Sequence, residues 1–121
     1  MTLQRRPARR ITVIVSETDT WEHRPLATEI LHRAHAAGLP GASVFRGVEG
    51  YGTTGHIHTV RILSLSDELP IAVVIVGDRD AIDDFVPEIA PLLKRGGVLT
   101  IEDVEVVEMV RDHLAEPGVP G

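Results

Sequence analysis

Apolar residues recur along this chain with two different periods, and together they predict six elements of secondary structure. Short aliphatic and β-branched runs, typical of strands, cover residues 11–15, 42–46, 69–76 and 98–107. Apolar residues spaced three or four apart, typical of amphipathic helices, cover residues 26–37 and 82–93. The predicted order is therefore strand, helix, strand, strand, helix, strand.

Proline and glycine mark the ends of the two predicted helices. Pro25 suits the first turn of the first helix, and Gly38 suits its C-terminal cap. Pro87 and Pro91 fall inside the second apolar pattern, where each lacks the N–H that a helix interior requires. We therefore expect the second helix to be kinked or shortened.

This order of elements favours one fold class. With right-handed crossovers it gives a four-stranded antiparallel sheet with two helices on one face, an α+β sandwich of the ferredoxin-like βαββαβ type. The other face of such a sheet has no partner within the chain. Burial against further copies of the chain is the simplest way to cover it, so we expect a closed homo-oligomer.

The 121 residues suffice for one domain, which we place at residues 10–110. Four arginines, Arg5, Arg6, Arg9 and Arg10, fall within the first ten residues, and residues 1–9 are interpreted as a flexible basic arm. Residues 111–121 end in a stretch rich in proline and glycine and are interpreted as a loose tail.

Composition excludes several classes of function. The net charge is 12 − 18 = −6, and without the four arginines of the first ten residues it is 8 − 18 = −10, which disfavours binding to nucleic acid. There is no cysteine, so disulfides, thiolate metal sites and thiol catalysis are excluded. The longest apolar run, residues 71–76, is far shorter than the roughly 20 residues of a membrane span. We expect a soluble, cytoplasmic protein.

A glycine-rich block is the strongest local feature. Gly47, Gly50, Gly52 and Gly55 fall within nine residues, which predicts a long mobile loop over residues 50–66. Glycine lets backbone amides approach an anion, and Arg46 beside the block can add a charge-assisted hydrogen bond. The alternative interpretation is a hairpin bulge followed by a loop.

A second basic and glycine-rich segment precedes the last predicted strand. Residues 94–97 read Lys-Arg-Gly-Gly, and cations and glycine are both common at a helix C-terminus for structural reasons alone. A phosphate-binding role is favoured only if this segment lies beside the glycine-rich block of a neighbouring subunit.

Two histidine pairs are candidate metal ligands. His56 and His58 share one face of an extended segment, and His32 and His35 lie one turn apart on the first helix. Zinc and copper sites need about four ligands, so solvated histidines are the better interpretation. The acidic residues near the C-terminus are interpreted as a solvated face, and no catalytic motif such as G-x-S-x-G is present.

Four segments of the chain resemble the PII-like family catalogued as domain of unknown function 190. They are Arg-Pro-Leu at residues 24–26, the glycine-rich block at 38–52, Leu-Ser-Asp-Glu-Leu-Pro at 65–70 and Glu-Asp-Val-Glu at 102–105. The resemblance covers roughly residues 10–108. It implies a PII-like homotrimer whose inter-subunit clefts hold an adenine nucleotide and whose long loop docks on a partner protein.

The resemblance carries over to particular residues. The cleft would be lined by Gly41, Arg46, Gly47 and Gly50, and the adjacent subunit would contribute phosphate contacts from Lys94, Arg95, Gly96 and Gly97. The partner-binding loop would include Tyr51, Gly52, Gly55 and His56. PII proteins carry alternating arginines after the last strand, whereas this chain has Glu108, Met109 and Val110 there. The expected ligand is therefore AMP or ADP rather than ATP.

The favoured hypothesis is a non-enzymatic, trimeric signalling protein that binds a small effector and controls a membrane channel, a transporter or an enzyme. A second hypothesis is a trimer resembling the CutA group that binds a divalent metal through His56 and His58 or through His32 and His35. A third is an enzyme acting on small phosphorylated compounds.

Overall fold

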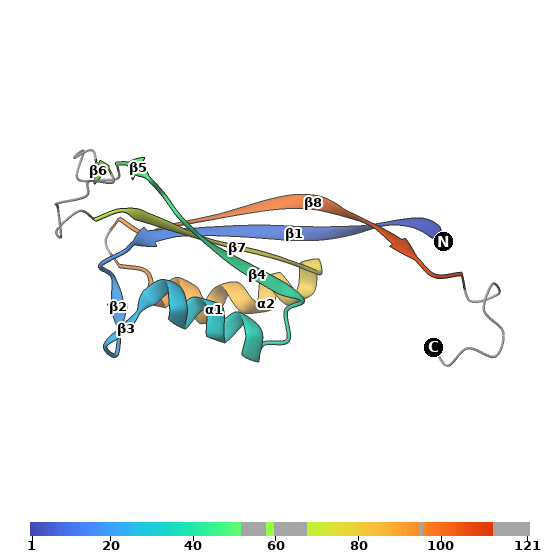
Figure 1. The fold of residues 1–121 in the computed structure, drawn as a ribbon. Helices are drawn as coiled ribbons and strands as arrows, with labels where there is room; N and C mark the ends of the chain where they lie inside the picture. Colours follow the sequence, from blue (N-terminus) through green and yellow to red (C-terminus); the bar gives the residue numbers. More distant parts are fainter. Residues whose placement is uncertain (52–57, 60–67, 95, 113–121) are drawn as a thin grey trace.

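The computed structural model describes residues 1–51, 58–59, 68–94 and 96–112 and has one sheet covered on one face by two helices. The sheet is antiparallel with the order β4-β7-β1-β8, formed by β4 (Gly41–Arg46), β7 (Pro70–Gly77), β1 (Thr2–Ser16) and β8 (Val98–Val110). Helices α1 (Leu26–Ala36) and α2 (Arg79–Ile89) lie side by side on the same face (Figure 1). This confirms the ferredoxin-like prediction.

Shorter elements complete the architecture. The strands β2 (Thr20–Trp21) and β3 (Arg24–Pro25) form a short hairpin before α1, and a two-residue turn connects them. Its turn residues have φ angles of 47° and 69°, which suits the type I′ geometry of tight hairpins. The strands β5 (Glu49–Gly50) and β6 (His58–Thr59) pair beyond the end of β4.

The helix ends follow the predicted signals. Gly38, with φ of 77°, ends α1, and the N–H groups of Gly38 and Leu39 donate to the carbonyls of His35 and Ala34 at 3.1 and 3.2 Å. This is a Schellman cap, which returns Leu39 to the core. The second helix is shorter than the apolar pattern: α2 ends at Ile89, two residues after Pro87, and a 3₁₀ turn (Ala90–Leu92) follows.

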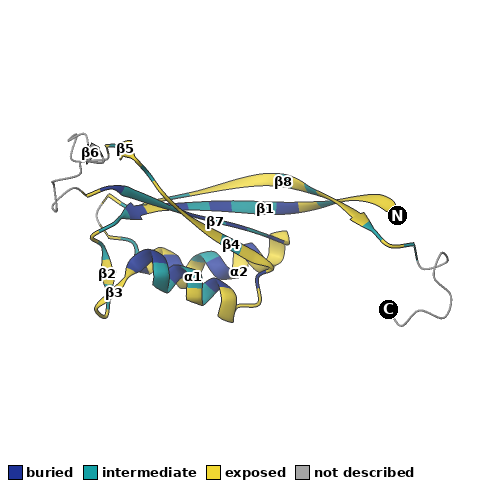
Figure 2. Ribbon diagram, viewed as in Figure 1, coloured by how far each residue is buried: buried dark blue, intermediate teal, exposed yellow. Residues whose placement is uncertain are grey.

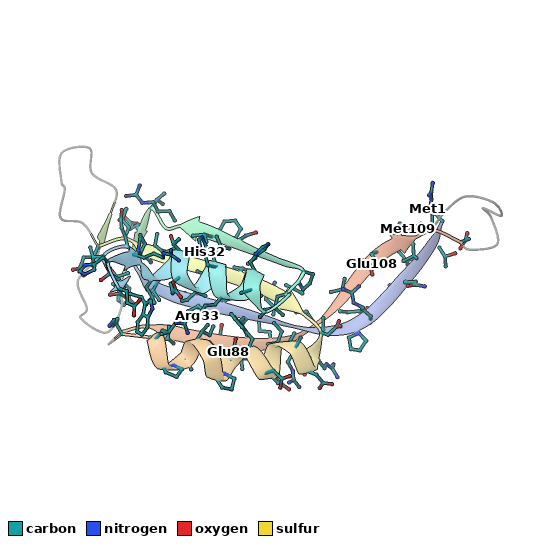
Figure 3. All side chains as sticks on the ribbon, turned by 90° about the horizontal axis from the view of Figure 1, so that it is seen from below. Met1, His32, Arg33, Glu88, Glu108 and Met109 are labelled. Carbon is teal, nitrogen blue, oxygen red and sulfur yellow. The ribbon has the colours of Figure 1, made fainter. Side chains whose placement is uncertain are left out.

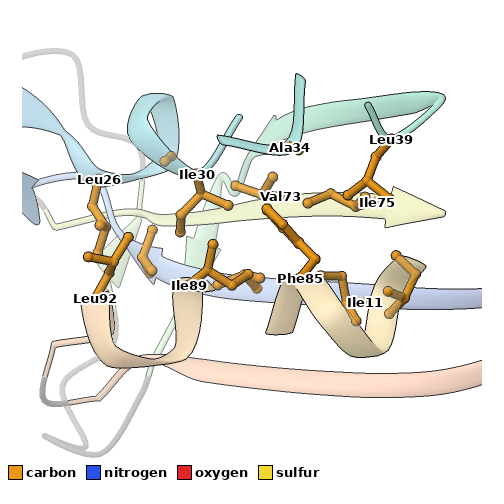
Figure 4. Packing of buried hydrophobic residues seen from close by; sticks show 14 residues of the cluster. Ile11, Leu26, Ile30, Ala34, Leu39, Val73, Ile75, Phe85, Ile89 and Leu92 are labelled. Atoms are coloured by element: carbon orange, nitrogen blue, oxygen red, sulfur yellow. The ribbon is translucent and has the colours of Figure 1, made fainter. Parts of the chain in front are cut away.

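The core lies between the sheet and the two helices and is almost entirely aliphatic (Figure 4). Alternate residues of β1 and β7 point toward the helices and are buried, as period-two alternation predicts. Phe85 of α2 is the largest fully buried side chain. The principal core residues are Ile11, Val13, Val15, Val73, Ile75, Leu26, Ile30, Ile82, Phe85 and Ile89.

The N-terminal segment is ordered, contrary to the interpretation of residues 1–9 as a flexible arm. Thr2–Ser16 is one continuous strand, and its first half pairs with β8 from Thr2↔Val110 to Ala8↔Val104. This part of β1 and β8 projects beyond the helices as a two-stranded ribbon (Figures 1 and 2). Residues 113–121 of the predicted tail lie outside the described residues.

Ion pairs join this basic segment to its neighbouring strand. Arg5, Arg9 and Arg10 reach Glu105, Asp103 and Glu102 on β8 at 3.2, 3.0 and 3.0 Å. Arg6 pairs with Glu108, and Arg9 also pairs with Asp83 of α2. The acidic residues interpreted as a solvated face are thus partners of the four arginines, which neutralise them across the strands.

The sheet face opposite the helices is open and partly apolar. In register across the four strands, Phe45, Ala72, Ile14 and Val98 form one row on this face. Phe45 is 57% exposed and Ile14 is 41% exposed. The chain thus leaves the uncovered apolar face that the strand pattern predicts.

Candidate functional site

Most of the described residues of the predicted nucleotide site lie at one end of the sheet. At this end β4 finishes with Arg46, β7 begins with Pro70, β1 finishes with Ser16 and β8 begins with Val98. The loops that leave these strand ends carry the glycine-rich block and the Lys94–Gly97 segment. The antiparallel topology therefore brings both predicted anion-binding segments to the same end of the sheet.

Arg46 is held by a carboxylate that the sequence analysis did not single out. Its Nη2 donates to Oε1 of Glu17 at 2.7 Å, while the Arg46 side chain remains 60% exposed. The backbone N–H of Glu17 donates to the carbonyl of Leu69 at 2.8 Å, which fixes Glu17 against the start of β7. The other carboxylate oxygen of Glu17 is buried and has no hydrogen-bond partner among the described residues. An anion bound by Arg46 would have to compete with Glu17.

Gly47 and Gly50 have a packing reason for being glycine. A Cβ at Gly47 would lie 2.6 Å from Cγ of Pro70, and a Cβ at Gly50 would lie 3.1 Å from the same atom. The N–H of Gly47 also donates to the carbonyl of Pro70 at 2.7 Å. These glycines let the chain cross closely over the start of β7, whatever else they bind.

Gly41 does not join this group within one subunit. It pairs with Val76 at the opposite end of β4, five residues from Arg46. At a rise of about 3.3 Å per residue, roughly 17 Å separate the two positions. The described chain brings Arg46, Gly47 and Gly50 together and leaves Gly41 apart.

The Lys94–Gly97 segment forms a tight turn into β8. The N–H of Gly97 donates to the carbonyl of Lys94 at 2.8 Å, and Gly96 has a φ of 90°, which favours glycine. Arg95 lies outside the described residues. Because β4 and β8 are the two edge strands, three strand spacings separate this turn from Arg46, or roughly 14 Å at about 4.8 Å each.

Only the base of the predicted partner-binding loop is described. Glu49 and Gly50 pair with Thr59 and His58, and Tyr51, which follows them, is 74% exposed. Gly52, Gly55 and His56 lie outside the described residues. The prediction of a mobile loop over residues 50–66 is not tested by the described segments.

The histidine pair on α1 has a positively charged neighbour. Nη1 of Arg24 lies 3.2 Å from Nδ1 of His32, which disfavours a cation at that nitrogen. His32 and His35 line a mostly apolar groove of about 440 Å³ between α1 and the start of β4. In the part of the chain that the structure describes, no three histidine or acidic side chains are grouped to hold a metal ion.

Polar contacts on α1 join the hairpin and the second helix. Arg33 donates from Nε to Glu29 at 2.8 Å, which lowers the pKa of that carboxyl below its ordinary 4.5. The Arg33 guanidinium lies 5.5 Å from the Trp21 ring and donates to the carbonyl of Glu88 at 3.2 Å (Figure 3). The i, i+4 spacing of Glu29 and Arg33 is the sequence signal for this network. These contacts hold the β2–β3 hairpin against α1, and they do not form a group of reactive side chains.

Comparisons with known proteins identify one family. The model of DUF190, described as "Uncharacterized ACR", matches residues 8–106. A UPF0166 protein of Aquifex aeolicus is 37% identical over 97 residues, covering 80% of this chain and 90% of the relative. A UPF0166 protein of Methanocaldococcus jannaschii is 27% identical over 99 residues, covering 82% and 91%.

Solved structures agree on the fold. CPII from Thiomonas intermedia K12, a nitrogen regulatory PII-like protein bound to ADP, AMP and bicarbonate, superposes with a TM-score of 0.62. It is 19% identical to this chain, and the match covers 85% of this chain and 91% of CPII. In the described part of this chain, no helix is long and apolar enough to cross a membrane.

Proposed function

The chain belongs to the DUF190 family, and from this membership and its PII-like fold we propose that it is a regulatory protein that binds an adenine nucleotide between identical subunits. The ADP and AMP bound to CPII support the choice of an adenine nucleotide. The structural neighbour named above, CPII, is a nitrogen regulatory PII-like protein, which favours a signalling role over catalysis. The bound effector would control a partner protein, either a membrane channel, a transporter or an enzyme.

One observation carries the proposal. Arg46 and the Lys94–Gly97 turn lie at the same end of the sheet but on opposite edge strands, three strand spacings or roughly 14 Å apart. In a closed ring, the β4 edge of one subunit would face the β8 edge of the next. Such a ring brings the two segments together at each subunit boundary, and we propose a homotrimer with three such clefts.

The open sheet face supports association of this kind. Its apolar row includes Phe45 and Ile14, which are both largely exposed in a single subunit. Burying apolar area contributes about 25 cal/mol per Å², so packing this row against other copies favours assembly. The assembly would place the edge strands of neighbouring subunits close to each other.

The switch we propose begins at Arg46. A phosphate that binds the guanidinium takes it from Glu17, which frees a carboxylate fixed against β7 beside the start of the long loop. Because Gly47 and Gly50 connect Arg46 directly to that loop, nucleotide binding would favour one conformation of residues 50–66. With Arg46 and Lys94 as the cationic side chains of the described site, AMP or ADP is a better match than ATP.

Calorimetric titration with AMP, ADP and ATP, together with the mass of the protein in the same buffer, tests the proposal. We expect a trimer that binds about one nucleotide per subunit. Arg46→Ala removes a charge-assisted hydrogen bond of about 1.5–3 kcal/mol and should weaken binding by roughly tenfold or more. Arg79→Ala is the matched control, because Arg79 is an exposed arginine at the opposite end of the sheet.

Two results would contradict the proposal. A trimer that binds none of the three nucleotides would exclude the adenine-nucleotide site. Equal affinities for the wild type, Arg46→Ala and Arg79→Ala would show that a bound nucleotide lies elsewhere.

A further inference from the structure

The two-stranded ribbon at the end of the sheet opposite Arg46 is a second candidate functional feature. We define it as residues 2–7 of β1 paired with residues 105–110 of β8. It projects beyond both helices (Figure 1), and residues 2–7 and 107–110 lie outside the segment that the DUF190 model matches. Most of the ribbon therefore lies outside the match to the family model.

Both edges of the ribbon are open. The pairing of β1 with β7 ends at Arg9↔Gly77, so residues 2–7 have a strand partner on one side only within the described chain. On the other side, β8 is an edge strand of the sheet. A ribbon of two strands is at best marginally stable alone in water and is stabilised by packing on one of its faces.

The two faces of the ribbon differ in polarity. Directly paired residues share a face, so the pairs Leu3↔Met109 and Arg5↔Val107 lie on one face of the ribbon. Leu3, Val107 and Met109, which we call the apolar ribbon face, are 54%, 51% and 53% exposed. Figure 3 shows Met109 on the ribbon, far from the labelled residues of α1.

On the other face of the ribbon, the residues that β1 contributes are polar. Thr2, Gln4 and Arg6 lie on it, opposite Val110, Glu108 and Val106. Leu3 and Gln4 are therefore neighbours in sequence that point to opposite faces of the ribbon.

The charges of the ribbon indicate what covers the apolar face. Residues 2–7 and 105–110 contain two arginines and two acidic residues, so their side chains sum to 2 − 2 = 0 while the rest of the chain carries all of the −6. Arg5 and Arg6 already pair with Glu105 and Glu108. A nucleic acid or an anionic membrane would have to compete with these carboxylates, whereas a neutral surface meets a copy of itself without repulsion.

We propose that the apolar ribbon face is an interaction surface for a second copy of this chain. It buries Leu3, Val107 and Met109 against the other copy, and the Arg5–Glu105 ion pair, which lies on the same face, borders this contact. The contact is separate from the proposed nucleotide cleft, because the ribbon and Arg46 lie at opposite ends of the sheet.

A pair of neighbouring substitutions tests the proposal. Leu3→Lys places a charge on the apolar ribbon face, and Gln4→Lys places the same charge on the opposite face one residue away. Sedimentation velocity over a series of dilutions measures assembly for the wild type and both variants, with circular dichroism as the check on folding. We expect Leu3→Lys to raise the concentration of half-assembly at least tenfold and Gln4→Lys to leave it unchanged.

Hydrogen exchange of the wild-type protein gives a second, independent measurement. The amides of residues 2–7 should be protected at concentrations where the protein is assembled and should lose that protection on dilution. The proposal is overturned if Leu3→Lys assembles like the wild type, if both variants lose assembly equally, or if protection of residues 2–7 does not depend on concentration. It is also overturned if the ribbon is protected only by vesicles of anionic lipid. Nucleotide binding at Arg46 is measured separately, by the calorimetric comparison of the wild type with Arg46→Ala.

Discussion

Gly47→Ala is the substitution that most directly tests the packing at the start of the long loop. The added Cβ would lie 2.6 Å from Cγ and 3.1 Å from the carbonyl oxygen of Pro70, well inside the roughly 3.5–4.0 Å of a normal carbon contact. The proline ring can change only its pucker, which moves Cγ slightly, because the ring is closed onto its own backbone. The hydrogen bond from the Gly47 N–H to the Pro70 carbonyl also holds the two segments together.

The expected magnitude follows from two opposing effects. Forcing an extra methyl group into a packed site costs about 1–3 kcal/mol. Replacing glycine by alanine also restricts the unfolded chain, which stabilises by about 0.4–1 kcal/mol. The net loss for Gly47→Ala is therefore about 1–2 kcal/mol. Gly41→Ala has only the second effect, because nothing lies within 4 Å of its added Cβ, and it should be neutral or slightly stabilising.

Urea unfolding of the two variants, followed by circular dichroism, measures this difference. Protein concentration must be the same in every sample, because assembly changes apparent stability. A difference of about 2 kcal/mol separates the two midpoints by roughly 1 M urea for an m value of about 2 kcal/mol per M. The packing argument is refuted if the two variants unfold at the same urea concentration. If Gly47→Ala kept full stability and lost nucleotide binding, the glycine would serve the ligand instead.

Three further predictions concern the core, the ion pairs and Arg46. Phe85→Ala should cost about 3–5 kcal/mol in urea unfolding, because Phe85 is fully buried, and a loss below about 1 kcal/mol would contradict the described core. The hydrogen bond from Arg9 lowers the pKa of Asp103 below its ordinary 3.8, so this pair stabilises the fold above that pH. The stability should decline as pH falls below about 4 and through the lowered value, and Asp103→Asn should flatten that decline in urea titrations over acid pH. Glu17→Gln removes the carboxylate that competes for Arg46 and should tighten nucleotide binding in calorimetry, whereas unchanged affinity would show that Arg46 need not leave Glu17.

The central part of the fold was predictable because its signals are local. The continuous apolar run in residues 69–76 and the three-to-four spacing in residues 26–37 are each contained within one element. Gly38 marks the end of α1 because only a left-handed residue completes the cap there. Such signals need no knowledge of the rest of the chain.

The ribbon was not predictable in the same way. Arg5 and Arg6 look like a solvated arm until their partners are known, and those partners, Glu105 and Glu108, lie about one hundred residues later. Taken separately, the arginines and the acidic residues both have the pattern of charged side chains that face solvent. Only the strand register places the arginines of β1 opposite the acidic residues of β8, and short sequence patterns do not specify that register.

The candidate site shows the same difference between local signals and contacts that are distant in the sequence. Arg46 and the glycines were identified from their local pattern, whereas Glu17 lies 29 residues before Arg46 and belongs to no motif. The glycines at 47 and 50 also proved to have a packing reason, which depends on the position of Pro70. Sequence alone indicates which residues can bind an anion but not which of them already have partners.

The pairing of the first strand with the last has a consequence for how the protein folds during synthesis. Ile11 on β1 pairs with Ile101 on β8, so the central strand cannot complete its hydrogen bonds until nearly the whole chain has left the ribosome. Contacts of such long sequence separation make folding slow, since a large loop must close before they contribute. Until β7 emerges, β1 is an unpaired apolar strand, and its second edge stays open until β8 follows; such open edges associate with other chains. The four arginines that precede Ile11 give this strand a positive charge, and like charges on nascent copies would oppose such association until β8 supplies the matching carboxylates.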